Sequence, residues 1–238
     1  MVGESYGAAA GWSIGPLVGF DTETTGLCPR SDRIVTAAVV HRHAGLTRTT
    51  TWLADPGVDI PEPASAVHGI TTAHARTHGR PGAEVLAELA RCLADALRAG
   101  TPVVAFNAGF DLAILDAELT RHGLPALPAR LGRTPRPVLD PLVLDRALHR
   151  YRPGTRRLVD LCAEYGVDPG EDLHAADVDA RATLDLLAAM ARAHPALARL
   201  AADQVHVWQE TVHRARVARR ERARRPPARP GERPQGRE

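Results

Sequence analysis

The sequence predicts an α/β domain built on a five-stranded mixed sheet flanked by helices. Short apolar runs rich in β-branched residues crowd the first part of the chain, which indicates strands. Apolar residues at every third or fourth position dominate the last part, which indicates helices. Between these parts, strand-like and helix-like segments alternate, so some neighbouring strands should be parallel. A length of 238 residues with 44% hydrophobic residues suffices for one sizeable core.

Three strands are expected at the start of the chain. Residues 16–20 are a short apolar run that leads into Asp21, so this carboxylate is expected at a strand end. Residues 32–43 and 47–53 are rich in β-branched side chains. The pair Ala-Gly at 44–45 separates them, which predicts an antiparallel hairpin.

Helices and two further strands are expected in the remainder. The strands are predicted over residues 102–106 and 136–139, each before a helical segment. Asp140 is a suitable N-cap for a helix whose first residue is Pro141. Other helices are predicted over residues 83–98, 111–122, 155–165 and 176–192, and from Pro195 towards Arg220.

These patterns predict four segments of chain. They are an N-terminal extension (1–15), one folded domain (16–193), a C-terminal helix (194–222) and a disordered tail rich in arginine and proline (223–238). No apolar run is long enough for a membrane span, and the first residues lack the pattern of a signal peptide. We therefore expect a soluble cytoplasmic protein with no membrane contact.

The distribution of charge and the spacing of cysteines give further information on possible binding sites. Residues 211–238 contain ten arginines against three glutamates, a net charge of +7, which leaves −5 for residues 1–210 of the total of +2. The basic tail could bind phosphates, or it could be a solubilising extension in a proteome that favours arginine, since the chain has no lysine. The cysteines Cys28, Cys92 and Cys162 are too widely spaced for a cysteine zinc site or a disulfide framework.

Four acidic residues and one histidine occur where predicted strands end and helices begin. Asp21 and Glu23 are two residues apart at a strand end, so they share one face and could bind one cation. Asp111 opens a helix after a buried strand, and His174 precedes Asp179 by five residues. Each has an ordinary alternative as a solvated strand end, a helix-start residue or a loop residue. Taken together, they point to a metal-dependent site.

Three segments resemble the motifs of a known family. Residues 20–26 (FDTETTG), 107–111 (NAGFD) and 174–179 (HAADVD) resemble, in order, the three motifs of the DEDDh (DnaQ-like) 3′-to-5′ exonucleases. This family includes the proofreading epsilon subunit of bacterial DNA polymerase III. The intervening residues 67–71 (VHGIT) and the leucine-rich segment 158–167 are also similar, so the resemblance covers roughly residues 16–193.

The resemblance implies a fold and a set of residue roles. The fold would be RNase H-like, with three antiparallel strands followed by two that are joined through helices. Two divalent cations, Mg²⁺ or Mn²⁺, would activate a water and stabilise the leaving oxygen, and His174 would act as the general base. Residues expected to hold the cations are Asp21, Glu23, Asp111 and Asp179, and those expected to contact substrate are Thr24, Leu27 and Asn107.

Three functions remain compatible with this sequence. The first is a DNA exonuclease that trims single-stranded or unpaired 3′ ends in DNA repair or proofreading, alone or beside a DNA polymerase. The second is a 3′-to-5′ exoribonuclease, because metal-assisted hydrolysis does not depend on the sugar. The third is a nonhydrolytic module that docks on a polymerase or on nucleic acid. A pure docking module has no need of five residues of catalytic type, which favours the first two.

Overall fold

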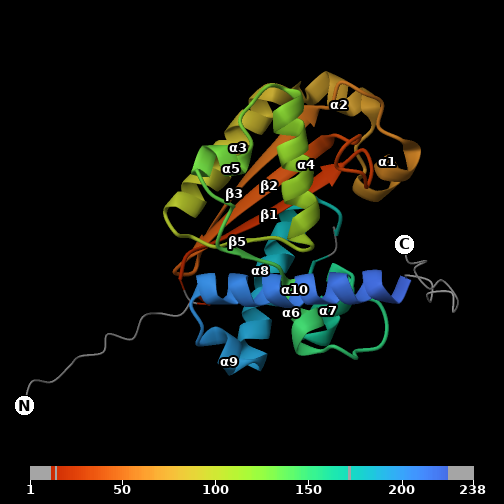
Figure 1. Ribbon diagram of the computed structural model, residues 1–238. Helices are drawn as coiled ribbons and strands as arrows, with labels where there is room; N and C mark the ends of the chain where they lie inside the picture. Colours follow the sequence, from red (N-terminus) through yellow and green to blue (C-terminus); the bar gives the residue numbers. More distant parts are fainter. Residues whose placement is uncertain (1–11, 14, 171–172, 225–238) are drawn as a thin grey trace, which may run out of the picture.

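A six-stranded mixed sheet, with strand order β4-β3-β2-β1-β5-β6, forms the centre of the molecule (Figure 1). The computed structural model describes residues 12–13, 15–170 and 173–224. Neighbours among the first three strands are antiparallel, whereas β5 is parallel to β1 and β6 is parallel to β5. The predicted mixed sheet is confirmed. Its strands are β1 (Leu17–Thr24), β2 (Ile34–His43), β3 (Leu46–Asp55), β4 (Arg80–Pro81), β5 (Val103–Val104) and β6 (Val138–Leu139).

Two details of the sheet differ from the prediction. The sheet has six strands rather than five, because the short β4 pairs in parallel with the end of β3. An Arg-Pro pair has no β-forming pattern of its own, so only the pairing reveals this strand. In addition, β1 continues past Asp21 to Thr24, since Asp21 and Glu23 still pair with Ala38 and Thr36 of β2. Asp21 thus lies within the strand rather than at its end.

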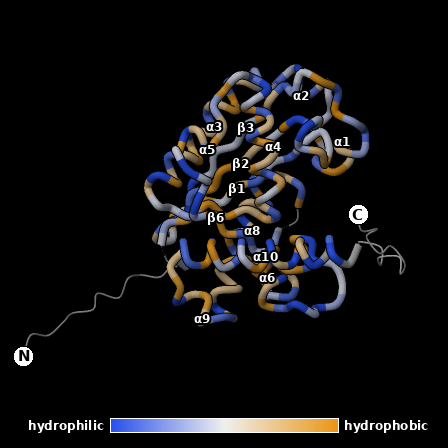
Figure 2. Tube along the Cα trace, in the orientation of Figure 1, coloured by the Kyte–Doolittle hydropathy of each residue, from blue (hydrophilic) through white to orange (hydrophobic). Residues whose placement is uncertain are grey.

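Helices cover both faces of the sheet. One hydrophobic cluster joins Val18 and Phe20 of β1 to α3 (Gly82–Arg98), α4 (Ala108–Arg121) and the short α5 (Leu127–Leu131). A second joins Leu17 of β1 and Val40 of β2 to α6 (Pro141–Leu148), α7 (Leu158–Glu164) and α8 (Ala176–Ala193). Figure 2 shows the hydrophobic residues concentrated where these layers meet. Asp140 caps α6 as predicted, accepting hydrogen bonds from the backbone N–H groups of Leu142 and Val143.

Three short helices were not predicted. They are α1 (Glu62–His68), α2 (Thr72–His78) and α5. Helix α1 has no buried residue and α2 has only Ala75, so neither has the apolar periodicity by which a helix is recognised in a sequence. No helix in the described part of the chain combines the length and apolar character of a membrane span.

The helix predicted from Pro195 to Arg220 is divided in two. Helix α9 (Pro195–Ala198) is followed by the long α10 (Ala202–Arg224), which crosses the molecule beside β6 and α6 (Figure 1). Two buried side chains attach α10 to β6. Gln209 donates to the carbonyl oxygen of Val138 at 2.8 Å and accepts from the N–H of Asp140 at 3.0 Å. Nδ1 of His206 lies 2.9 Å from the same carbonyl oxygen. The position of α10 is therefore set by hydrogen bonds to the outer strand of the sheet.

Candidate active site

The close approach of α8 to β1 brings three carboxylates together. Alternate residues of a strand point to opposite faces, so Asp21 and Glu23 lie on the same face as Gly19. A Cβ atom at residue 19 would lie 2.8 Å from the carbonyl oxygen of Ala180, so only glycine allows the α8 backbone to lie this close. Asp179, the residue before Ala180, is consequently held beside the pair on β1.

A fourth carboxylate reaches the site from the opposite helix layer. Strand β5 ends at Val104, and the chain then turns into α4, whose first turn carries Asp111. The start of α4 is held by Asp140, which accepts hydrogen bonds from the backbone N–H groups of Asn107 and Ala108 at 3.1 and 3.0 Å. Thr22, between Asp21 and Glu23 but on the other face of β1, donates its hydroxyl to Asp111 Oδ1 at 2.7 Å. This bond ties the fourth carboxylate to the strand that carries the first two.

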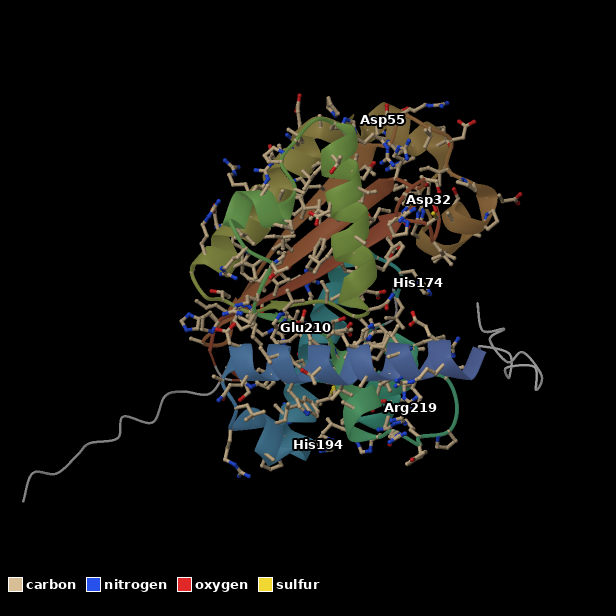
Figure 3. The ribbon with its side chains drawn as sticks, in the orientation of Figure 1. Asp32, Asp55, His174, His194, Glu210 and Arg219 are labelled. Atoms are coloured by element: carbon tan, nitrogen blue, oxygen red, sulfur yellow. The ribbon has the colours of Figure 1, made fainter. Side chains whose placement is uncertain are left out.

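His174 lies immediately before α8, next to two of these carboxylates. Its backbone N–H donates to Asp179 Oδ1 at 3.2 Å. Potential ligand atoms of His174, Glu23 and Asp179 lie within 4.8 Å of one another. In Figure 3 the exposed His174 lies between the end of the sheet and α10. The φ angle of +82° places this residue in the left-handed region, which is unusual for a residue other than glycine.

Burial raises the pKa of all four carboxyl groups, and repulsion between them contributes at Asp21 and Glu23. Burial, followed by the negative charges of Asp111, Asp179 and Glu23, raises the pKa of Asp21 well above its usual value. The same two causes raise the pKa of Glu23 to about 8, and burial raises that of Asp111 to about 7. Burial also raises the pKa of Asp179. Carboxylates gathered in this way are stabilised by a cation, and hard oxygen donors suit Mg²⁺ or Mn²⁺. The residues present therefore fit a divalent metal site.

A cavity beside Glu23 could accept an apolar ring. Its volume is about 290 Å³, and it lies between the loop after β1 and helix α1. The loop is shaped by Asp32, which accepts a hydrogen bond from the N–H of Cys28 at 2.6 Å (Figure 3). The side chain of Leu27, on this loop, is 89% exposed. The cavity is lined by Glu23, Thr24, Thr25, Gly26, Leu27, Pro61, Pro63, Ala64, Val67 and His68.

Most of the site residues proposed from the sequence lie together. Asp21, Glu23, Asp111, His174 and Asp179 form one cluster, and Thr24 and Leu27 line the adjoining cavity. Asn107 differs, because it lines a separate cavity of about 320 Å³ between α4, α6 and α10.

Sequence reasoning missed three residues that position this cluster. They are Gly19, Thr22 and Asp140, whose contacts are described above. For Thr22 a signal was available, since strand alternation places it on the face opposite Asp21 and Glu23. No local pattern indicates the roles of Gly19 and Asp140, because both depend on elements that are distant in the sequence.

Changing Gly19 to Ala is expected to impair the site without altering any acidic residue. The added methyl group would contact the Ala180 carbonyl oxygen and Leu184, pushing α8 and Asp179 away from β1. We expect a destabilisation of about 1–3 kcal/mol from overpacking and a fall in turnover of roughly 10²-fold from misplaced groups. Urea unfolding and single-turnover assays measure the two effects. Gly82→Ala is the matched control, because its Cβ would meet its neighbours at an ordinary 3.5 Å. Wild-type turnover in Gly19→Ala would contradict the role given to this close contact.

Metal binding is expected to strengthen as pH rises. A carboxyl group with a raised pKa in the folded state stabilises that state at low pH, and this contribution disappears as pH rises through the folded-state value. For Glu23 and Asp111 the loss extends from their ordinary values of 4.5 and 3.8 to about 8 and 7. A cation replaces these protons, so affinity should rise by up to about tenfold per pH unit for each proton displaced. Thermal unfolding at pH 6, 7 and 8, with Mn²⁺ or with EDTA, measures this. An equal Mn²⁺-induced shift in Tm at pH 6 and 8 would contradict it.

The chain is similar to exonucleases in sequence and in fold. A model of the RNase T family, described as Exonuclease, matches residues 18–187. The DNA polymerase III subunit epsilon of Treponema pallidum is 30% identical over 182 residues, covering 74% of this chain and 76% of that protein. The DNA polymerase III PolC-type of Streptococcus mutans is 32% identical over 176 residues, covering 71% of this chain but only 10% of that polymerase.

Among solved structures, exonuclease I shares the fold. The enzyme from Methylocaldum szegediense has a TM-score of 0.63 at 24% identity, covering 76% of this chain and 41% of that one. Exonuclease I of E. coli in complex with a dA16 oligonucleotide has a TM-score of 0.63 at 20% identity, covering 76% and 42%.

Proposed function

The chain belongs to the RNase T exonuclease family, and we propose that it is a metal-dependent 3′-to-5′ exonuclease acting on DNA. The observation that carries the proposal is the convergence of four carboxylates and one histidine at the end of β1. The direction of cleavage is taken from the DEDDh exonucleases, which the three motifs resemble. The acidic residues and the histidine of those motifs are the residues that converge, which supports the resemblance. We assign the exonuclease domain to residues 16–193 and treat α10 as an addition to it.

The carboxylates and the histidine would divide the work of hydrolysis. Divalent cations held by Asp21, Glu23, Asp111 and Asp179 would, when bound, lower the pKa of the attacking water and neutralise charge on the phosphoryl and leaving oxygens. His174 would take the proton from that water. The bond from its N–H to Asp179 fixes the backbone of this residue beside the carboxylates.

The 3′-terminal nucleoside would occupy the cavity next to Glu23. Leu27 and Val67 are exposed there, at 89% and 52%, and offer apolar surface to a base. Thr24 is less available through its side chain, because its hydroxyl donates to the carbonyl oxygen of Gly26 at 2.7 Å. Substrate contacts of Thr24 would therefore be made by its backbone.

DNA is proposed as the substrate because the relatives include a DNA polymerase III subunit epsilon and a PolC-type DNA polymerase III. The match spans about a tenth of the PolC-type polymerases and about three quarters of the epsilon subunit from Treponema pallidum. Work beside a DNA polymerase, including proofreading, is part of the proposal on the same ground.

A labelled-strand assay tests the proposal. Single-stranded DNA and RNA of one sequence, labelled at either the 3′ or the 5′ end, are incubated with the protein and Mg²⁺, Mn²⁺ or EDTA. We expect immediate release of the 3′ label as a mononucleotide and a ladder of shortening 5′-labelled DNA, both abolished by EDTA. A preference for the RNA strand would reassign the substrate. Absence of cleavage of either strand would overturn the proposal in favour of a docking module.

A further inference from the structure

A groove lined by arginines lies between α6 and α10. Its volume is about 420 Å³, and four of the seven residues that line it are arginines. Helix α6 and the residues after it contribute Arg146, Ala147 and Arg150, and α10 contributes Val212, Ala215, Arg216 and Arg219. We call this the arginine groove. Figure 3 shows Arg219 on the side of α10 that faces away from the sheet in that view.

No carboxylate lines the arginine groove, as far as the described residues show. Nearby arginines outside it are paired with acids. Arg152 and Arg156 donate to the buried Asp145 at 2.9 and 2.7 Å, and Arg214 donates to Glu210 at 2.6 Å. The described lining of the groove therefore carries a net positive charge from its side chains. Such a site attracts anionic groups, and the flat guanidinium fork matches a phosphate particularly well.

An exposed aromatic ring contacts one of the arginines that line this groove. Tyr151 is 85% exposed, and the guanidinium of Arg150 lies 5.3 Å from the centre of its ring. Arginines together with an exposed aromatic ring are the combination by which proteins bind single-stranded nucleic acid, because bases stack on the ring while phosphates meet the arginines. An acidic peptide would use the charges but would make no use of the exposed ring for base stacking.

The groove adjoins a second cavity, which reaches the start of α4. Arg146 lines both the arginine groove and the 320 Å³ cavity that reaches Asn107 and Gly109. These residues lie at the start of α4, whose first turn carries Asp111. Hydrophilic residues recur along α10 (Figure 2). The family match ends at residue 187, so the α10 side of the groove lies outside it, whereas Arg146, Ala147 and Arg150 lie within it.

We propose that the arginine groove binds the phosphodiester backbone of a single-stranded nucleic acid whose 3′ end occupies the carboxylate site, with Tyr151 stacking on one of its bases. The inference rests on the proposed function and names the surface that holds the strand upstream of the cleaved bond. On this proposal the strand passes the cavity beside Asn107, which shares Arg146 with the arginine groove.

Equilibrium binding in an inactive background tests the groove without relying on hydrolysis. The full chain with Asp21→Asn is titrated into fluorescein-labelled dT15 or U15, and anisotropy is read across a range of NaCl concentrations. The double variant Arg150→Glu, Arg219→Glu should weaken binding by about tenfold or more and reduce the slope of log Kd against log[salt] by about 1.4, for two lost phosphate contacts. Tyr151→Ala should weaken binding by about fivefold or more with little change in slope.

Two further variants separate the groove from a general effect of charge. Arg150→Lys, Arg219→Lys keeps both charges and should retain most of the salt slope. Arg91→Glu, Arg192→Glu reverses two exposed arginines outside the groove and should bind like the parent. An unchanged Kd in the groove variants, or an equal loss in the Arg91 and Arg192 control, would overturn the proposal.

Kinetics in the active protein complete the test. For dT15 the groove variant should show a raised KM with an unchanged kcat. For the p-nitrophenyl ester of thymidine 5′-monophosphate, which has no upstream strand, turnover should equal that of the wild type. A loss of ester hydrolysis in the groove variant would contradict a role limited to strand binding. If the wild-type protein hydrolyses neither substrate, the proposed function fails while the binding result for the groove stands.

Discussion

Asp21→Asn is expected to abolish exonuclease activity while leaving the metal-free fold intact. Asp21 is the carboxylate on which the charges of Asp111, Asp179 and Glu23 all act. Its loss should lower turnover by roughly 10⁴-fold, the scale seen when an essential catalytic group is removed. Because asparagine has nearly the same shape without the charge, it also removes the repulsion between residue 21 and the other three acids. We therefore expect a Tm in EDTA that is equal to or higher than that of the wild type, and a much smaller increase on adding Mn²⁺.

Asp185→Asn is the matched control for this change. Asp185 lies further along α8 than Asp179, is half exposed and pairs with Arg42 at 2.7 Å. The Asp185→Asn variant loses one negative charge on the same helix as Asp179 but outside the carboxylate cluster. Turnover and the Mn²⁺ response should stay close to wild type in this control. An Asp21→Asn protein that still cleaves DNA and gains stability from Mn²⁺ would remove the basis for the metal site.

His174→Gly is expected to lower kcat by about 10²–10⁴-fold, the usual effect of losing a general base, with Mn²⁺ affinity preserved. Glycine is chosen rather than alanine because residue 174 has a φ of +82°, which glycine adopts without strain. The backbone N–H that donates to Asp179 Oδ1 is retained by this variant. Added imidazole should restore part of the lost turnover, because it can occupy the space of the missing ring.

The metal measurement decides between two roles for this histidine. A ring nitrogen lies within 4.8 Å of carboxylate oxygens of Glu23 and Asp179, so the ring could bind a cation together with them. A fall in Mn²⁺ affinity in His174→Gly, with no rescue by imidazole, would make it a metal ligand instead of a base. His149→Gly provides a comparison at a histidine that lies outside the carboxylate cluster and contacts His194 at 3.3 Å. Its kcat should not respond to imidazole.

Elements with a strong periodic pattern could be predicted from the sequence. Over residues 83–98, for example, the apolar side chains of Val85, Leu89 and Leu93 recur every fourth position, and all three are fully buried in α3. Helices α1 and α2 could not be predicted in this way, because they bury almost nothing. Strand β4 has no β-forming residues and exists through its pairing with β3. The periodic pattern of apolar residues therefore indicates which segments are buried. Helices and strands that bury few side chains cannot be predicted from it.

For the candidate site too, the sequence predicts some features and not others. The motifs identify the acids and His174, because these residue types at these spacings are unusual as a set. The sequence does not show how closely α8 approaches β1, since Gly19 and Ala180 are 161 positions apart and meet only in the folded chain. Asn107 belongs to a motif, yet it lines a cavity away from Glu23, because its φ of +61° begins the turn into α4. Spacing identifies chemical groups, and packing decides which of them meet.

The attachment of α10 to β6 also affects whether two copies of the chain can pair through the edge of the sheet. Strand β6 is the last strand of the sheet, and an outer strand with free backbone groups can pair with a strand of another chain. His206 and Gln209 occupy those groups at Val138 and Asp140. A chain that ended before Ala202 would expose them, together with the hydrophobic surface that α10 covers. Helix α10 thus occupies backbone groups at this edge that a strand of another copy would need for pairing.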